Sequence, residues 1–183
     1  MTFRQTERFN FDDTRFIFMT NFSGDPKRDN FGDSRRKVNI IVPSEQLAKD
    51  LMKAGIKVRT TTPGKYDDPN DFVPEYHVTI LVQFRKKDGE PVKYPPAVYL
   101  VTPGCDPVKM TEETIGSLDH IRIKNVNCVA TIRDYIDSHG NPGRNLQTRT
   151  MYIEQDMDDD PYAARYSRQN EPAPEAEAED DDF

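Results

Sequence analysis

Short runs in which apolar and polar residues alternate constrain the fold of this chain more than any other feature of its sequence. The clearest run spans residues 75–84, where every second side chain is large and apolar. A period of two residues is typical of a half-buried strand. Further runs that alternate, or are rich in aromatic or β-branched residues, predict strands at 15–22, 36–42, 56–61, 97–102, 121–135 and 149–154. The chain is therefore predicted to fold mainly as β-sheet.

Two helices are predicted between these strands. In residues 43–55, Ser44 is a suitable N-cap and Gly55 a suitable stop. The apolar stripe expected on this helix is Leu47, Ala48, Leu51 and Met52. A shorter helix is predicted at 111–120, with Thr111 as its cap. Several strands, one early helix and few signs of parallel βαβ units indicate a small closed or partly open β-barrel.

Three connections are expected to be loops. The Asp88-Gly89 pair between two strand-like runs predicts a hairpin. Residues 137–145, with two glycines and a proline, are expected to join the last two strands, and residues 61–72 form a long polar connection. From residue 156 onward Pro, Ala, Glu and Asp dominate, a composition that cannot bury enough surface to fold. We therefore expect a folded domain at 1–155 and a disordered acidic tail at 156–183.

Charge is divided unevenly between these two parts. Residues 154–183 carry 12 acids and 2 bases, whereas residues 1–153 carry 20 acids and 23 bases. The formal net charge of −7 therefore conceals a mildly basic body. A basic body with an acidic appendage is typical of a nucleic-acid-binding protein with an interaction tail. The tail ends in Asp180, Asp181, Asp182 and Phe183, a set that suits a basic groove with an apolar pocket on a partner protein.

No pattern of catalytic or metal-binding residues is found. His77, His120 and His139 do not have the spacing of zinc ligands, and neither a nucleophile elbow nor a phosphate-binding P-loop is present. Cys105 and Cys128 are interpreted as reduced thiols of a cytosolic protein. The Asp pairs at 12–13 and 67–68 and the run at 158–160 are interpreted as polar loops and tail. No run is apolar enough for a signal peptide or membrane helix. We expect no enzyme activity, cofactor or metal.

Cations and aromatic residues recur on the polar faces of the predicted strands. Sheets that bind single-stranded nucleic acid need cations along the phosphates and flat side chains on which bases stack. Lys57 and Arg59 are expected to share one face, as are Arg133 with Tyr135, and Arg149 with Met151. The candidate DNA contacts are Arg35, Arg36, Lys57, Arg59, Arg85, Arg133, Tyr135, Arg144 and Arg149. Without a helix-turn-helix or zinc-finger pattern, readout of a duplex is less favoured.

Five segments together resemble the single-stranded DNA-binding proteins of tailed phages. They are NFSGDP (21–26), SEQLAKDLMKAGIKVR (44–59), YPPAVYLVT (94–102), IGSLDHIRIKNVNCVATIRDY (115–135) and GNPGRNLQTRTMYIE (140–154). The resemblance covers roughly residues 14–154 and implies an OB-type β-barrel that binds single strands with little regard to sequence. It also implies an acidic tail that ends in phenylalanine. Asp182 departs from the bacterial pattern, in which apolar residues precede the final phenylalanine.

The expected function is that of a non-catalytic single-stranded DNA-binding protein. It would coat and protect DNA in phage replication or recombination, in the cytoplasm of an infected bacterial cell. Its tail would recruit phage or host replication proteins, or fold back on its own DNA groove. Two alternatives stay open: a metal-dependent nuclease or recombination enzyme that uses the Asp clusters, and a virion structural or assembly protein. The sequence also leaves open RNA binding and whether the protein forms a homo-oligomer.

Overall fold

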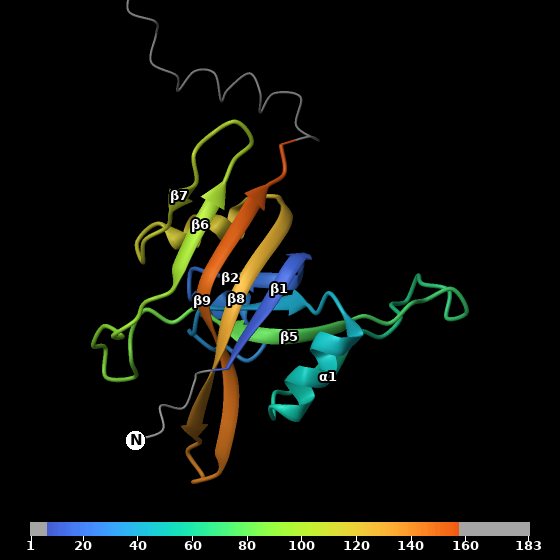
Figure 1. Ribbon diagram of the computed structural model, residues 1–183, viewed down its shortest axis with the longest axis horizontal. Helices are drawn as coiled ribbons and strands as arrows, with labels where there is room; N and C mark the ends of the chain where they lie inside the picture. The colour runs from blue at the N-terminus through green and yellow to red at the C-terminus, as the bar shows by residue number, and fades with distance from the viewer. Residues whose placement is uncertain (1–6, 158–183) are drawn as a thin grey trace, which may run out of the picture.

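The computed structural model describes residues 7–157. Nine strands in this part of the chain belong to one mixed sheet (Figure 1). They are β1 (Arg8–Thr14), β2 (Phe16–Asn21), β3 (Lys37–Ile41), β4 (Arg59–Thr60), β5 (Tyr76–Leu81), β6 (Ala97–Val101), β7 (Val108–Lys109), β8 (Ile123–Ile136) and β9 (Pro142–Gln155). The helical elements are α1 (Glu45–Lys53) and two 3-10 segments, η1 (Pro26–Arg28) and η2 (Ile115–His120).

The sheet closes on itself through its first two strands. Its order is β1-β8-β9-β5-β3-β2, and only Arg15 separates β1 from β2 along the chain. Because β1 pairs with β8 and β2 pairs with β3, the two are halves of one bent strand that joins both edges. The pairing of β5 with β9 is parallel, and β8 with β9 is antiparallel. This mainly β, OB-like barrel confirms the predicted fold class.

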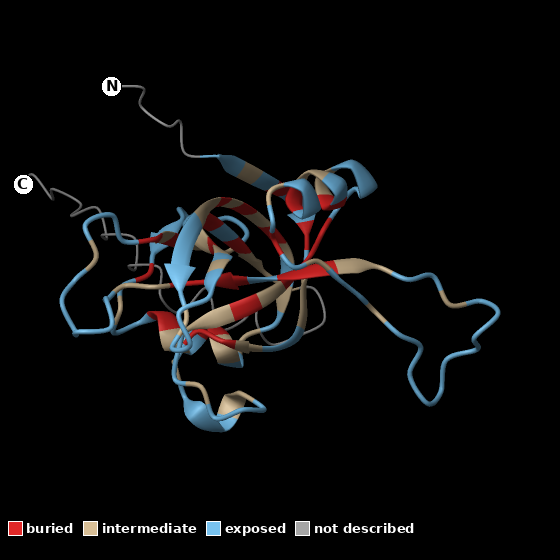
Figure 2. Ribbon diagram, turned by 90° about the horizontal axis from the view of Figure 1, so that it is seen from below, coloured by how far each residue is buried: buried red, intermediate tan, exposed pale blue. Residues whose placement is uncertain are grey.

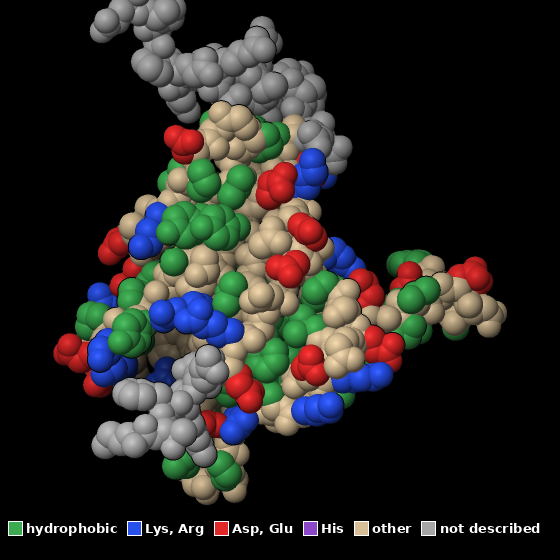
Figure 3. Space-filling model, in the orientation of Figure 1, with side chains coloured by type: hydrophobic (Ala, Val, Ile, Leu, Met, Phe, Trp, Pro, Cys, Tyr) green, Lys and Arg blue, Asp and Glu red, His purple; other side chains and the backbone are tan. Residues whose placement is uncertain are grey.

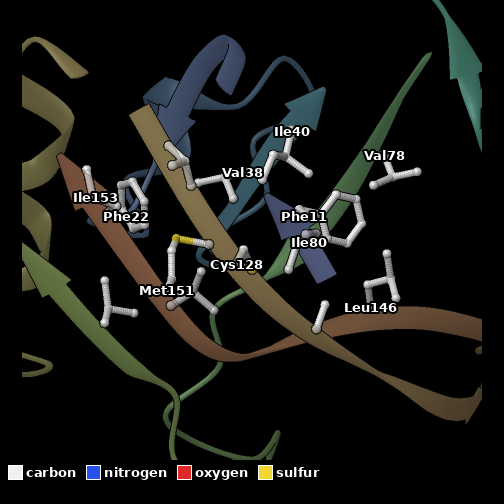
Figure 4. Packing of buried hydrophobic residues seen from close by; sticks show 14 of the residues in the cluster. Phe11, Phe22, Val38, Ile40, Val78, Ile80, Cys128, Leu146, Met151 and Ile153 are labelled. Carbon is white, nitrogen blue, oxygen red and sulfur yellow. The ribbon is translucent and has the colours of Figure 1, made fainter. Parts of the chain in front are cut away.

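The barrel interior is filled by large apolar side chains from almost every strand. Figure 4 shows Phe11, Phe22, Ile80, Met151 and Ile153 converging between the strands, and Figure 2 shows the buried residues concentrated in the barrel wall. The alternation predicted at 75–84 is present, because Val78, Ile80 and Val82 are all buried. The period-two pattern therefore identified the core face of β5.

Helix α1 lies where the sequence predicts it. The hydroxyl of Ser44 accepts a hydrogen bond from the backbone N–H of Leu47 at 3.1 Å, and Gly55 follows the helix with φ +83°. Ala48 and Leu51 are buried, but Met52, predicted on the same stripe, is half exposed. None of the helices in the described part of the chain is long and apolar enough to cross a membrane.

Two sequence-based predictions of local structure are wrong in detail, and two strands were missed. The helix predicted at 111–120 is a 3-10 segment that begins only at Ile115, and the Thr114 hydroxyl accepts from the backbone N–H of Thr111 at 2.8 Å. The loop predicted at 137–145 is tighter, because β8 and β9 extend to Ile136 and Pro142. Strands β1 and β7 were not predicted at all. The connection between β4 and β5 is long, as predicted, and projects from the side of the barrel (Figures 1 and 2).

Candidate nucleic-acid interface

A groove of about 890 Å³ lies on the outer face of β2, β3 and β5. The loop between β2 and β3 forms one wall, and the β8–β9 hairpin forms the other. Its cations are Lys27, Arg28, Arg35, Lys37, Lys57, Arg59 and Arg144, and its aromatic residues are Phe18, Phe31 and Tyr135. Among the described residues that line it, Asp29 is the only acid. The groove therefore combines positive charge with flat side chains.

The structure divides the nine predicted contacts into three groups. Arg35, Lys57, Arg59, Tyr135 and Arg144 come together in the groove, although they derive from four separate segments of the chain. Arg133 and Arg149 line a second hollow, which the groove does not include. Arg36 and Arg85 line neither. The groove thus collects the larger part of the predicted set.

Arg36 and Arg85 lie instead beside Glu112. The Nε of Arg36 donates to the carbonyl of Phe22 at 2.9 Å, its guanidinium lies 5.6 Å from the Phe84 ring centre, and its Nη1 is 3.7 Å from Glu112. The Nε of Arg85 is 2.8 Å from the same carboxylate. Hydrogen bonding from Arg85 and the nearby charges lower the pKa of Glu112. The two arginines therefore attach the segment before η2 to the barrel.

The loop wall is itself organised by charge pairs. Lys37 Nζ is 2.9 Å from Asp29, and Arg35 Nη2 is 2.7 Å from Asp33. The hydrogen bond from Arg35 lowers the pKa of Asp33 to about 2, and that from Lys37 lowers the pKa of Asp29. Both carboxylates thus remain ionised at neutral pH and offset part of the wall's positive charge. Among residues 7–157, Lys27, Lys57 and Arg59 have no ion pair, so their charge is available to a ligand.

Phe18 is one of five basic or aromatic groove residues missing from the predicted contacts, with Lys27, Arg28, Phe31 and Lys37. The Phe18 ring is 66% exposed, and its backbone has φ +62° at a break in the β2–β3 register between Ile17 and Asn21. A positive φ is strained for a bulky residue, and residues with such strain cluster at functional sites. The ring packs edge-on against buried His77, with ring centres 5.2 Å apart. Burial and the charge of Arg59 lower the pKa of His77. No signal in an aromatic-rich run distinguishes the one outward ring.

Tyr135 lies across its cross-strand partner in the β8–β9 hairpin. It pairs with Gly143, and a Cβ at Gly143 would lie 2.4 Å from the Tyr135 ring. Only glycine therefore allows the ring to lie there. Next to it, Arg144 donates to the carbonyl of Ala54 at 2.8 Å and pairs with Asp134 at 2.9 Å. Arg144 thus ties the hairpin wall to the end of α1.

A β-bulge at Arg149 changes which face of β9 the following side chains occupy. Thr150 pairs with Val129 and Thr148 pairs with Ala130, so Arg149 has no residue opposite it. The extra residue reverses the alternation along β9. Arg149 is consequently exposed, whereas Met151 is fully buried. The prediction that these two side chains share a face is therefore wrong.

The described residues contain no group of three or more His, Cys, Asp and Glu side chains placed to hold a metal ion. Asp67 and Asp68 accept hydrogen bonds from the backbone N–H groups of Gly64 and Asn70, at 2.7 and 2.9 Å, and so stabilise turns. Cys128 is buried, which raises the pKa of its thiol to about 12. The run at 158–160 and the tail residues Asp180, Asp181, Asp182 and Phe183 lie outside the described residues.

Two phage proteins are among the solved structures to which this chain is similar. No family model and no curated protein sequence matches the chain. The fold is similar to gp2.5, a single-stranded DNA-binding protein of bacteriophage T7, with a TM-score of 0.41 and 12% identity over 82% of this chain and 87% of that one. It is also similar to the single-stranded DNA-binding protein of bacteriophage Enc34, with a TM-score of 0.45 and 8% identity over 87% and 89% of the two chains.

Proposed function

We propose that the protein is a non-catalytic single-stranded DNA-binding protein. The groove carries this proposal, because seven cations and three aromatic side chains line one face of an OB-like barrel. OB-folds bind oligonucleotides on the face of neighbouring strands and on the loops beside that face. The protein would coat and protect single strands in phage replication or recombination, within the cytoplasm of the infected host.

The aromatic residues favour a single strand over a duplex. Phe18 and Phe31 are both strongly exposed at the groove, and Tyr135 is partly exposed. Only unstacked bases can lie on such rings, each worth about 1–3 kcal/mol of binding. The cations would follow the phosphates without regard to sequence. The groove therefore suits sequence-tolerant binding.

The direct test is a titration of an oligo-dT strand and a matched duplex at several NaCl concentrations. We expect the single strand to bind more tightly. A plot of the logarithm of its binding constant against the logarithm of the NaCl concentration should have a slope of roughly −2 to −4, since each phosphate contact contributes about −0.7. A slope near zero, or equal affinity for the duplex, would contradict the proposed groove.

The same preparation addresses the two alternatives. Labelled strands are incubated with the protein and Mg²⁺. Cleavage that Asp67→Ala abolishes would favour a nuclease. Complete absence of oligonucleotide binding would favour a structural or assembly role in the virion. Binding without cleavage would support the function proposed here.

We propose further that the 1–155 domain binds DNA, whereas the 156–183 tail recruits replication or recombination proteins. Ending the chain at Met157 removes ten acids and two bases but keeps the hydrogen bond from Asp156 N–H to the Arg122 carbonyl at 2.8 Å. We expect tighter DNA binding, most clearly at low salt, because a tethered polyanion no longer competes for the groove. Thermal melting should barely change.

Deletion of Phe183 alone is the matched control for this truncation. It leaves every side-chain acid in place, so DNA affinity should stay nearly unchanged, while a partner that reads the tip is no longer recruited. Weaker DNA binding, or an unfolded body, after truncation at Met157 would refute an inhibitory role for the tail.

A further inference from the structure

A second basic hollow, which we call the lateral pocket, lies on the side of the barrel. It is separate from the groove and has no role in the function proposed above. It has a volume of about 470 Å³ and is lined by Arg8, Lys86, Lys93, Tyr94, Arg133 and Arg149, among others. In Figure 3, Lys and Arg side chains gather around a hollow at the left, between the 85–94 loop and β9. We propose that this pocket binds the continuation of the same single strand beyond the groove, an inference that rests on the proposed function.

Within residues 7–157, no acidic side chain offsets the positive charge of the lateral pocket. No Asp or Glu lines it, and none of its five cations forms an ion pair with another residue of the described 7–157 segment. The groove differs, because Arg28, Arg35, Lys37 and Arg144 each lie within 3.4 Å of a carboxylate. Like charges held together without counter-charges repel, and an anionic ligand removes that repulsion. The lateral pocket is therefore a stronger candidate for phosphate than its size alone suggests.

Tyr94 gives the pocket a surface for a base as well. Its ring is 66% exposed, with the Arg149 guanidinium 5.3 Å and the Lys93 ammonium 5.4 Å from the ring centre. These cation–π contacts orient the ring, and both rings and guanidinium planes are surfaces on which bases stack.

The groove and the lateral pocket are neighbours along the same strands. On β9, Asn145 lines the groove and Gln147 lines the pocket. After β5, Gln83 lies at the junction, where its Oε1 accepts from Arg133 Nη1 at 2.9 Å and from Gln147 Nε2 at 3.1 Å. This seam is polar and uncharged apart from Arg133. A strand that leaves the groove across it reaches Tyr94 without leaving the barrel surface.

The test is the dependence of affinity on strand length, with the full-length chain. OB barrels occupy about 4–16 nucleotides, so a series of oligo-dT strands from 4 to 24 nucleotides brackets the groove alone and the groove with the pocket. We expect the double variant Tyr94→Ala with Arg149→Gln to bind the shortest strands like the wild type. On the longest strands it should lose at least about fivefold in affinity.

Lys49→Gln, on the exposed face of α1, is the matched control for lost charge and should leave the length dependence unchanged. Because Tyr94 and Arg149 are exposed, the double variant should melt like the wild type. A photoreactive base at one end of the long strand should crosslink to Tyr94, and the same base on the shortest strand should not.

Two results would overturn the proposal while leaving the groove intact. One is an unchanged length dependence in the double variant with no crosslink at Tyr94. The other is binding of a synthetic acidic peptide of residues 171–183 to the wild type but not to the double variant, again with unchanged length dependence. If no strand of any length binds the wild type, the proposed function itself fails.

Discussion

Replacement of Asp119 by alanine is expected to lower the free energy of unfolding by about 3–5 kcal/mol, the range found when one partner of a buried ion pair is removed. The Asp119 side chain is fully buried, and Oδ2 lies 3.4 Å from Arg28 Nε. Its oxygens also accept from the hydroxyl of Thr20 at 2.8 Å and from the N–H groups of Phe22 and Ser23 at 2.8 and 3.0 Å. Alanine would leave these donors without an acceptor.

Urea unfolding measures this loss, and two further variants define its cause. Asp119→Asn keeps one acceptor oxygen and should cost less. Asp106→Ala, in an exposed loop, should change stability by no more than about 0.5 kcal/mol. If Asp119→Ala cost under about 1 kcal/mol, the carboxylate would not be what anchors the start of the β2–β3 loop. Because that loop is one wall of the groove, the variant should also weaken DNA binding in the molecules that stay folded.

The parts of the fold that sequence predicted are those governed by local periodicity. Alternation identified β5, and a cap with an apolar stripe identified α1. Strand β1 was missed although Phe9 and Phe11 alternate, because the run is short and continues into Asp12 and Asp13. The closure of the barrel depends on pairing Arg8–Thr14 with residues more than a hundred positions away, which no local pattern contains.

The candidate site was predictable to the extent that its residues lie on regular strands. Lys57 and Arg59 alternate on an exposed run and do meet in the groove. The sequence could not show that Arg36, unlike Lys57 and Arg59, lies outside the groove, since its partner Glu112 is 76 residues away along the chain. Arg149 was misplaced by a bulge, and Phe18 is exposed by an irregular backbone. Such features arise from packing across the barrel.

Simultaneous replacement of Lys57 and Arg59 by alanine is expected to weaken binding of oligo-dT by roughly 20- to 30-fold near 0.1 M salt. Both side chains line the groove, and neither has an ion pair among the described residues. Two lost phosphate contacts should also make the log–log salt slope less steep by about 1.4. Fluorescence titrations across a range of NaCl concentrations measure both quantities.

The salt slope separates contact with phosphate from a general effect of charge. Lys49→Ala with Lys53→Ala removes the same charge from the exposed face of α1, and should change affinity little and the slope by less than a single contact. Equal losses in the two double variants would mean that net charge attracts DNA without a defined path. No loss in the Lys57 and Arg59 variant would place the strand outside the groove, because these two are among the three groove cations, with Lys27, that no carboxylate of residues 7–157 neutralises.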